Sequence, residues 1–360
     1  MNKYALSLLL LPIILSVATA SFARTFKQAL PGYTFSFPRD HASHEDYKTE
    51  WWYYTGHLQS KSGKKYGYEL TFFRQGMEEG QQKPRNAYLA HFAISDQNTN
   101  QFHVFERLSR SGLPTGEARS DLFYVANQGW SAESLGDQFL LRAESEGYAI
   151  HLLLSPAKPP VVHGKNGVSQ KASGKGCASH YYSMTRLKTK GTLFIDSQAE
   201  PVEGISWMDH EFGSNQLTDE QVGWDWFSIQ LDDNSEIMLY IMRRRDGTID
   251  NNSSGTLINS DGSSIHLNYS DFTISSKSTW ISPHSQGKYP MGWQVKIPKC
   301  KIDLSIEPAF KDQELITTRS TDVTYWEGSS QVSGSKNGNP TRGQSYVEMT
   351  GYAAAFKKKI

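Results

Sequence analysis

The chain has 360 residues, and its 37 basic and 37 acidic side chains give a formal net charge of +0 with histidine neutral. A balanced charge argues against a nucleic-acid partner, because phosphate backbones are bound through an excess of Lys and Arg. The length fits two domains of about 150 residues each. Only two cysteines occur, Cys177 and Cys300, so an oxidising compartment permits one disulfide, although their spacing does not establish it.

Residues 1–23 have the layout of a secretory signal peptide. Lys3 precedes an apolar run from Ala5 to about Ala18, and small residues follow at 18–20 and 21–23. This order of segments is typical of a cleaved leader. The alternative is an uncleaved anchor, but the run is shorter than the roughly 20 apolar residues that span a bilayer. We therefore predict a periplasmic or secreted protein.

The remainder of the sequence predicts an all-β protein. Short apolar or alternating runs lie between clusters of Gly, Asn, Asp, Ser and Pro, and no long stretch has the 3.6-residue period of a helix. Asp246-Gly247 and Asp261-Gly262 are typical of hairpin turns, while the Gly/Ser-rich ranges 163–179 and 327–343 indicate a long loop and a hairpin tip. We expect antiparallel barrels or sandwiches, with strands that include 88–94, 101–108, 139–142, 148–154, 192–195, 237–242, 293–297 and 346–352.

One aromatic phrase occurs twice. Trp51–Leu58 aligns without a gap with Trp224–Leu231, so that Trp52 corresponds to Asp225, and Tyr68–Arg74 then corresponds to Ile237–Arg243. Such a repeat indicates two similar domains in tandem. The offset of the repeat, added to the start of the mature chain, predicts domains at 24–195 and 196–360.

The second copy places an acid in apolar surroundings. If Trp224–Leu231 is a strand, Asp225 and Phe227 lie on one face, whereas Trp224 and Trp226 lie on the other. Poor solvation raises the pKa of a carboxyl group and keeps its proton available for general acid catalysis. The alternative is that Asp225 pairs with an arginine of the range 243–245.

A second acidic phrase lies upstream, at residues 206–213. On a strand, Asp209 and Glu211 point to one side and His210 to the other, with Phe212. His210 is either a satisfied structural residue or a proton relay, since histidine titrates near neutral pH. In the first copy Glu50 is the analogous acid, and His57 adds another polar group to a core-like strand.

Other chemistries have little support. The segment His41–Glu45 offers two histidines and an acid, but it lacks the i, i+4 spacing of metalloprotease helices, and its flanks favour a surface loop. We expect no metal site. The chain has no Gly-x-Ser-x-Gly turn, phosphate-binding loop or dinucleotide fingerprint, so no cofactor is expected.

Several phrases resemble the AttH/CrtC-like family over nearly the whole mature chain. They are 49–58 (TEWWYYTGHL), 180–183 (HYYS), 207–211 (WMDHE), 223–227 (GWDWF), 325–328 (YWEG) and 346–352 (YVEMTGY). The resemblance implies two tandem lipocalin-like β-barrel domains. Members of this family are described as secreted hydrolases, lie beside components of ABC exporters, or are carotenoid 1,2-hydratases, which add water to a terminal isoprenoid double bond.

The resemblance also implies roles for single residues. It places the catalytic acid on Asp225, with Asp209 as a rival, and the assisting histidine on His210. Aromatic faces would stabilise the carbocation that forms when an alkene is protonated. The side chains expected to surround the ligand are Glu50, Trp52, Tyr54, His57, Tyr182, Phe212, Trp224, Trp226 and Phe227.

Two functions remain open at this point. The first is an exported protein that binds a hydrophobic, isoprenoid or lipid-like ligand and catalyses its acid-assisted hydration or hydrolysis. The second is a non-catalytic carrier or an accessory protein of an ABC-type exporter permease complex, in which Asp225 and His210 anchor a ligand headgroup.

Overall fold

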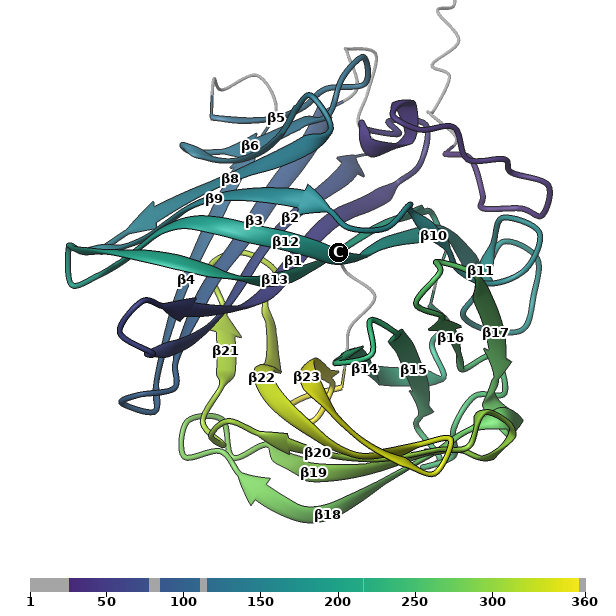
Figure 1. Cartoon of the computed structure of the whole chain (residues 1–360). Coiled ribbons are helices and arrows are strands. Elements are labelled where there is room, and N and C mark those ends of the chain that lie inside the picture. Colours follow the sequence, from purple (N-terminus) through teal and green to yellow (C-terminus); the bar gives the residue numbers. More distant parts are fainter. Residues whose placement is uncertain (1–25, 78–84, 111–114, 216, 356–360) are drawn as a thin grey trace, which may run out of the picture.

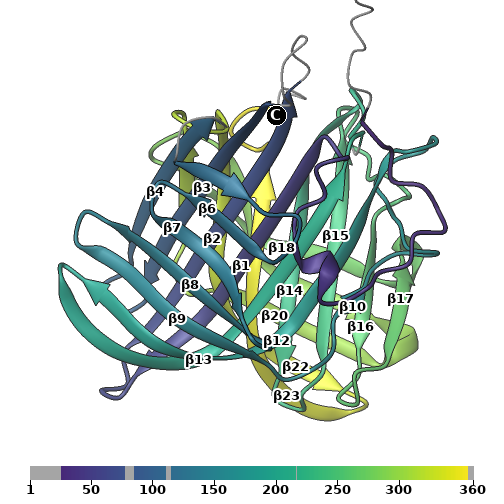
Figure 2. The same ribbon diagram turned by 90° about the horizontal axis from the view of Figure 1, so that it is seen from above.

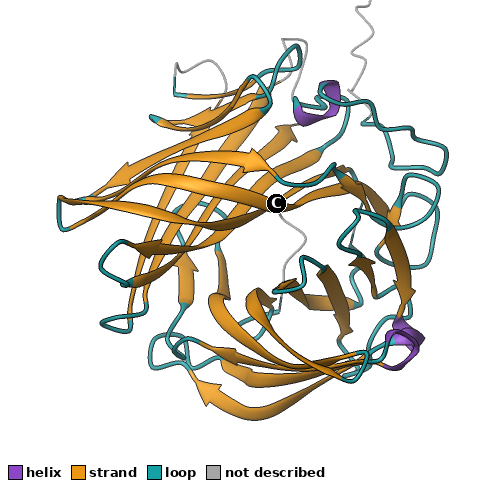
Figure 3. Ribbon diagram, viewed as in Figure 1, coloured by secondary structure: helices purple, strands orange, loops and turns teal. Residues whose placement is uncertain are grey.

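The computed structural model of the chain describes residues 26–77, 85–110, 115–215 and 217–355. The predicted signal peptide at 1–23 lies outside these residues. The described chain is almost entirely strand, with three short 3-10 helices, η1 (Arg39–His41), η2 (Tyr269–Asp271) and η3 (Pro298–Cys300) (Figure 3). Among the described residues, no helix has the length and apolar character needed to cross a membrane.

The first sheet contains 13 antiparallel strands in the order β4-β3-β2-β1-β13-β12-β9-β8-β7-β6-β5, with β10 and β11 also paired to β12. It curls until its ends meet, since Asn127 of β6 donates a hydrogen bond to the carbonyl of Tyr88 on β3 at 3.0 Å. Its strands are β1 (Thr49–Ser60), β2 (Lys65–Met77), β3 (Arg85–Asp96), β4 (Gln101–Arg110), β5 (Gly116–Ala118), β6 (Tyr124–Asn127), β7 (Trp130–Leu135), β8 (Gln138–Ser145), β9 (Tyr148–Pro156), β10 (Val161–Val162), β11 (Ser169–Gln170), β12 (Ala178–Ile195) and β13 (Gln198–Gly213).

The second sheet contains ten antiparallel strands in the order β17-β16-β15-β14-β23-β22-β20-β19-β18, with β21 paired to β22. It also curls, and it lies beside the first sheet (Figures 1 and 2). Its strands are β14 (Gln221–Leu231), β15 (Glu236–Arg244), β16 (Ser254–Ile258), β17 (Ser264–Asn268), β18 (Thr273–Ile281), β19 (Lys288–Ile297), β20 (Ile302–Pro308), β21 (Glu314–Thr317), β22 (Val323–Lys336) and β23 (Asn339–Thr350). The predicted all-β architecture of two lipocalin-like sheets is confirmed.

Tight turns join many of these strands. Asn337 and Gly338 both have positive φ, at 54° and 80°, as a two-residue hairpin turn requires. The expected hairpin tip over 327–343 is therefore wrong in extent, because β22 and β23 continue to either side of this dipeptide. Asp261-Gly262 joins β16 to β17 as predicted.

The repeat occupies equivalent places in the two sheets. Strand β1 lies between β2 and β13, and β14 lies between β15 and β23. The sheets change between Gly213 and Gln221, so the expected boundary near residue 195 falls inside a hairpin of the first sheet, between β12 and β13. That division of the chain into domains stays a prediction.

Apolar side chains form one core inside each sheet and a third cluster between the sheets. The predicted long loop at 163–179 crosses to the second sheet, where the His163 ring hydrogen-bonds to Thr256 at 2.8 Å and Ser169 to Tyr240 at 3.0 Å. Cys177 and Cys300 are free thiols. The two sheets are thus held together by apolar contacts and by hydrogen bonds between side chains on both.

Candidate functional site

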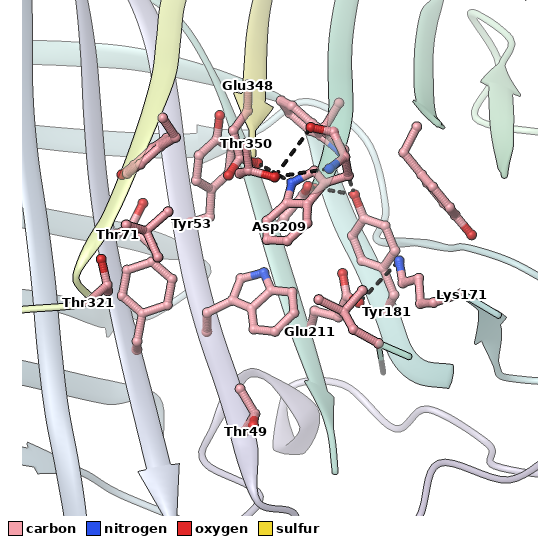
Figure 4. Close-up of a pocket in the computed structure, with 18 of the residues that line it drawn as sticks. Thr49, Tyr53, Thr71, Lys171, Tyr181, Asp209, Glu211, Thr321, Glu348 and Thr350 are labelled. Carbon is pink, nitrogen blue, oxygen red and sulfur yellow. Dashed lines mark hydrogen bonds and ion pairs between the residues drawn. The ribbon is translucent and has the colours of Figure 1, made fainter. Parts of the chain in front are cut away.

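A cavity of about 400 Å³ lies between the two sheets, within the range of roughly 300–1,000 Å³ typical of small-molecule sites. Strands β1, β2, β12 and β13 line one side, and β14, β15, β22 and β23 line the other. Figure 4 shows the side chains that project into it. We call it the inter-sheet pocket.

The duplicated aromatic phrase forms its apolar walls. Alternation along β1 and β14 directs Trp51 and Tyr53 from the first sheet, and Trp224 and Trp226 from the second, into the same space. The rings of Tyr53 and Trp226 meet edge to face, with centroids 5.2 Å apart. The repeat therefore builds one shared aromatic site instead of two separate ones.

Asp209 is the acid at the centre of the first sheet's wall. It lies opposite Tyr53 in the strand register, and it accepts hydrogen bonds from Tyr181 at 2.5 Å, from the Trp207 indole at 2.6 Å and from Ser183. Burial raises the pKa of Asp209 to about 7, against the lowering effect of these donors. A carboxyl group with this pKa can give and take a proton near neutral pH.

The partners of Ser183 show that it is not a nucleophile of the serine-hydrolase kind. Its hydroxyl lies between Asp209 and the Nε2 atom of His163, which is 2.6 Å away, and the other ring nitrogen bonds to Thr256. In a catalytic triad the acid hydrogen-bonds to the histidine and orients it. Here the acid, Asp209, hydrogen-bonds to the serine instead. Ser183 is also fully buried, so the trio supports the position of Asp209.

An ion pair lies on the same wall as Asp209. Glu211, two residues along the same face of β13, has its Oε1 atom 3.1 Å from the ammonium of Lys171. That ammonium also lies 4.2 Å from the ring centroid of Tyr240 and 4.8 Å from that of Tyr181. Lys171 thus neutralises Glu211, and in the described residues Asp209 forms no ion pair of its own.

Three glutamates also line the pocket, namely Glu69, Glu327 and Glu348. Glu69 accepts hydrogen bonds from Thr71 at 2.7 Å and Tyr325 at 3.3 Å, and Glu327 accepts one from Tyr53 at 2.7 Å. Burial raises the pKa of Glu69 to about 7, and burial together with the neighbouring acids raises that of Glu327 well above its usual range. Burial and neighbouring acids likewise raise the pKa of Glu348 to about 8, although the Trp224 indole donates to it at 3.1 Å.

The other face of β13 points into the first barrel, where His210 lies against Glu50. The Nε2 atom of His210 is 2.9 Å from Glu50 Oε1, and its Nδ1 atom is 3.1 Å from the Tyr182 hydroxyl. Arg74 donates to the other oxygen of Glu50 at 2.9 Å. Burial, which would raise the pKa of Glu50, is outweighed by Arg74 and the two histidines His210 and His44, so this pKa lies well below its usual range.

Ligand atoms of His44, Glu50 and His210 lie within 4.8 Å of one another, which is close enough to consider a metal ion. Their geometry fits a hydrogen-bonded network better. Both histidine nitrogens are 2.9 Å from the same oxygen, Glu50 Oε1, and the Arg74 guanidinium would repel a second cation. The segment 40–44 is buried here, so the expected surface loop at His41–Glu45 is wrong for its first residues.

Asp225 lies in the core of the second sheet, beside Phe227. Its oxygens accept hydrogen bonds from Arg243 at 3.1 Å and from the Tyr352 hydroxyl at 3.0 Å. Burial raises its pKa, and Arg243 lowers it. The alternative drawn from the sequence, an arginine partner from 243–245, is the arrangement found. Asp225 does not line the inter-sheet pocket.

Of the residues expected to surround a ligand, Trp224 and Trp226 line the pocket together with Asp209. The others lie elsewhere. Trp52, Tyr54 and Tyr182 belong to the core of the first sheet, Phe227 to that of the second, and Phe212 stacks on His44 with ring centroids 3.6 Å apart. His57 is buried between the sheets, where its Nδ1 atom is 3.2 Å from the Ser329 hydroxyl.

A repeated local pattern in the sequence marks Asp209 and two of the three glutamates, Glu327 and Glu348. An aromatic residue precedes an acid by two positions in Trp207-Met208-Asp209, Tyr325-Trp326-Glu327 and Tyr346-Val347-Glu348. Residues two positions apart on a strand have their side chains on the same face, so each of these acids lies beside an aromatic ring. Asp209 and Glu348 even hold equivalent places, opposite Tyr53 and Trp226 respectively.

With the fold and this site described, the relatives of the chain can be compared. The AttH-like family profile matches residues 28–352. The chain belongs to the AttH-like family. No match is found among the curated proteins.

Solved structures extend the comparison. A Nitrosomonas europaea protein described as AttH is 30% identical to this AttH-like chain, with a TM-score of 0.83 over 91% of this chain and 99% of the other. Kievitone hydratase from Nectria haematococca is 16% identical, with a TM-score of 0.69 over 92% of this chain and 98% of the other. CghA, solved with Sch210972, is 11% identical, with a TM-score of 0.53 over 85% and 89%. The last two likenesses concern the fold alone.

Proposed function

We propose that the inter-sheet pocket binds an apolar, unsaturated ligand and that Asp209 catalyses the addition of water to one of its carbon–carbon double bonds. The observation that carries this proposal is a buried carboxyl group, with a pKa of about 7, in a wall of aromatic rings. A similarly folded protein that bears the name kievitone hydratase agrees with this choice.

The reaction balances without a further reagent. The carboxyl proton of Asp209 bonds to one alkene carbon, which uses the π electron pair and leaves a cation on the other carbon. Tyr53, Trp224 and Trp226 offer aromatic faces that stabilise positive charge. Water then forms the carbon–oxygen bond, and its surplus proton returns to the Asp209 carboxylate. Hydrolysis through a serine nucleophile is disfavoured because Ser183 is buried between His163 and Asp209.

The test uses water labelled with heavy oxygen and a panel of isoprenoid, fatty and prenylated aromatic alkenes. We expect one labelled oxygen in the product, detected by mass spectrometry. Asp209→Asn should lower turnover by about 100-fold or more while ligand affinity is kept. Asp303→Asn, on the surface of the second sheet, is the matched control.

If members of the panel bind but no labelled product forms, the alternative function is favoured, namely a non-catalytic carrier or an accessory protein of an exporter. Turnover that persists in Asp209→Asn would remove the assignment of the acid.

We also propose export from the cytoplasm, on the basis of residues 1–23. The N-terminal residue of the protein purified from cells, determined by mass spectrometry, tests this. Cleavage near residue 23 supports export, and an intact Met1 contradicts it.

A further inference from the structure

The glutamate end of the inter-sheet pocket, defined as Glu69, Glu327 and Glu348, plays no part in the reaction proposed above. Glu327 and Glu348 face each other across β22 and β23 in the strand register. Glu69 comes from the other sheet and meets β22 through the Tyr325 hydroxyl. All three line the pocket, so one end of an apolar cavity holds three converging carboxyl groups.

Two of these three groups are not fully satisfied by the described part of the chain. Glu69 is 1% exposed and Glu327 is 0% exposed, yet the Oε2 atom of each has no hydrogen-bond partner in the part of the chain that the structure describes. A buried polar atom without a partner is unfavourable. Two such atoms on adjacent groups of one cavity indicate that a ligand completes the site.

The charges of the surroundings point to the sign of that ligand. Within the described ranges none of the three glutamates forms an ion pair, and Lys171 is already committed to Glu211. Burial raises the pKa values of Glu327 and Glu348, and the repulsion between neighbouring acids raises them further, since like charges directly opposite on neighbouring strands are unfavourable. A bound cation would remove this repulsion and allow the carboxyl groups to ionise.

Aromatic rings surround the same end. Tyr53 bonds to Glu327, Tyr325 to Glu69 and the Trp224 indole to Glu348, and Phe73 also lines the pocket. Carboxylates combined with aromatic faces are the chemistry that binds organic ammonium groups. The surroundings are too apolar for a strongly hydrated metal ion, which needs several oxygen ligands and water.

We propose that the glutamate end of the pocket binds the positively charged head of an organic ammonium ligand, whose apolar part lies along Trp226 and Tyr53. This deepens the proposed function, on which it rests for the pocket itself, because it names the charge class of the ligand. Anionic lipids and fatty acids are excluded by the same groups.

Calorimetric titration of the full chain with three probes of equal chain length tests the proposal. The probes are decyltrimethylammonium, decanol and decanoate. We expect the ammonium to bind at least about tenfold more tightly than the alcohol, because a charge-assisted contact is added, and the carboxylate to bind most weakly. Equal affinities, or a preference for the alcohol or the carboxylate, would overturn the proposal.

Proton release at pH 7 provides a second readout. Titration in buffers of different ionisation enthalpy should show protons released with the ammonium probe and none with the alcohol. The release reports every titratable group that lines the pocket in the described residues, namely Lys48, Tyr53, Glu69, His91, Lys171, Tyr181, Asp209, Glu211, Tyr240, Tyr325, Glu327 and Glu348. The absence of any release with the ammonium probe would contradict ionisation of the glutamates.

Variants locate the effect. Glu327→Gln and Glu69→Gln should each reduce the ammonium preference about tenfold or more, whereas the matched control Glu307→Gln, on the surface of β20, should keep it. Asp209→Asn should keep the preference and lose hydration. A preference that survives both pocket variants refutes the head-group site, while loss of labelled product alone concerns only the hydration proposal. If a variant does not fold, the probe series on the unaltered protein still decides.

Discussion

Glu50 and Asp209 are both buried acids at the pairing of β1 with β13, but they lie on opposite faces of the first sheet and differ in protonation. Glu50 contacts Arg74, His44 and His210, and its pKa lies well below the usual range. Asp209 contacts only neutral donors, and its pKa is about 7. Equal burial thus produces opposite shifts, because charged partners in direct contact outweigh desolvation at Glu50, whereas the hydrogen-bond donors to Asp209 are neutral.

The difference in pKa gives the two acids different roles: Glu50 stabilises the fold, and Asp209 can transfer a proton. An ionised carboxylate held by a guanidinium fixes the packing of the barrel but has no proton to give. A neutral carboxyl group on an aromatic wall keeps its proton near neutral pH and can donate it to an alkene.

The largest effect is expected on the Glu50 side. Arg74→Met should lower the free energy of unfolding by about 3–5 kcal/mol, since it leaves a buried carboxylate without its strongest partner. Chemical denaturation measures this. Arg142→Met is the matched control, because the side chains of Arg142 and its partner Glu133 are 52% and 31% exposed and a solvent-accessible pair of this kind contributes about 0–1 kcal/mol. Equal losses in the two variants would show that Glu50 needs no guanidinium.

The pH dependence of stability should carry the signature of the pocket acids. Asp209 and Glu348 have folded pKa values of about 7 and 8, above their ordinary 3.8 and 4.5. The folded protein keeps protons that the unfolded chain releases, so stability is full below about pH 4 and is lost as pH rises to 7–8. The slope is about 1.4 kcal/mol per pH unit for each group.

Glu50 acts in the opposite sense. Its depressed pKa contributes stability above its ordinary value of 4.5, which is lost as pH falls through the folded pKa. Denaturation curves from pH 5 to 8 should show falling stability in the unaltered protein and a flatter profile in Asp209→Asn/Glu348→Gln. An unchanged slope in that double variant would mean that these acids do not hold their protons.

A smaller effect is expected at Asp225. Asp225→Asn weakens charge-assisted bonds to Arg243 and Tyr352, which should reduce the free energy of unfolding by about 1.5–3 kcal/mol. Turnover of the labelled-water assay should remain, because Asp225 lies outside the inter-sheet pocket. If turnover instead falls as far as in Asp209→Asn, the acid suggested first by the sequence is the catalyst.

The sequence predicted the fold and the faces of key strands well. Alternation correctly separated Trp224 and Trp226 from Asp225 and Phe227, because a strand's period of two is independent of its surroundings. It could not tell which face looks into a barrel and which looks between sheets, since both faces are buried. The apolar face that holds Asp225 was therefore interpreted as the site, whereas it is a core.

The composition of the pocket was harder to predict. Glu69 and Glu327 are 258 positions apart in sequence (327 minus 69) and meet only because β2 and β22 belong to different sheets that face each other. No local pattern gives that contact. Residue Glu327 was also placed in a hairpin tip, since Gly and Ser outnumber apolar residues around it, although the ladder between β22 and β23 continues through them.

The equivalence of Asp209 and Glu348 has a consequence for how the cavity could diversify. In an isologous dimer every substitution appears twice, so the two walls of a shared site must stay identical. Here one polypeptide supplies both walls, and a change in either is independent of the other. Ser183 opposite Asp209 and Glu327 opposite Glu348 are the outcome: the two walls of one cavity carry different side chains, which can fix the orientation of a long molecule inside it.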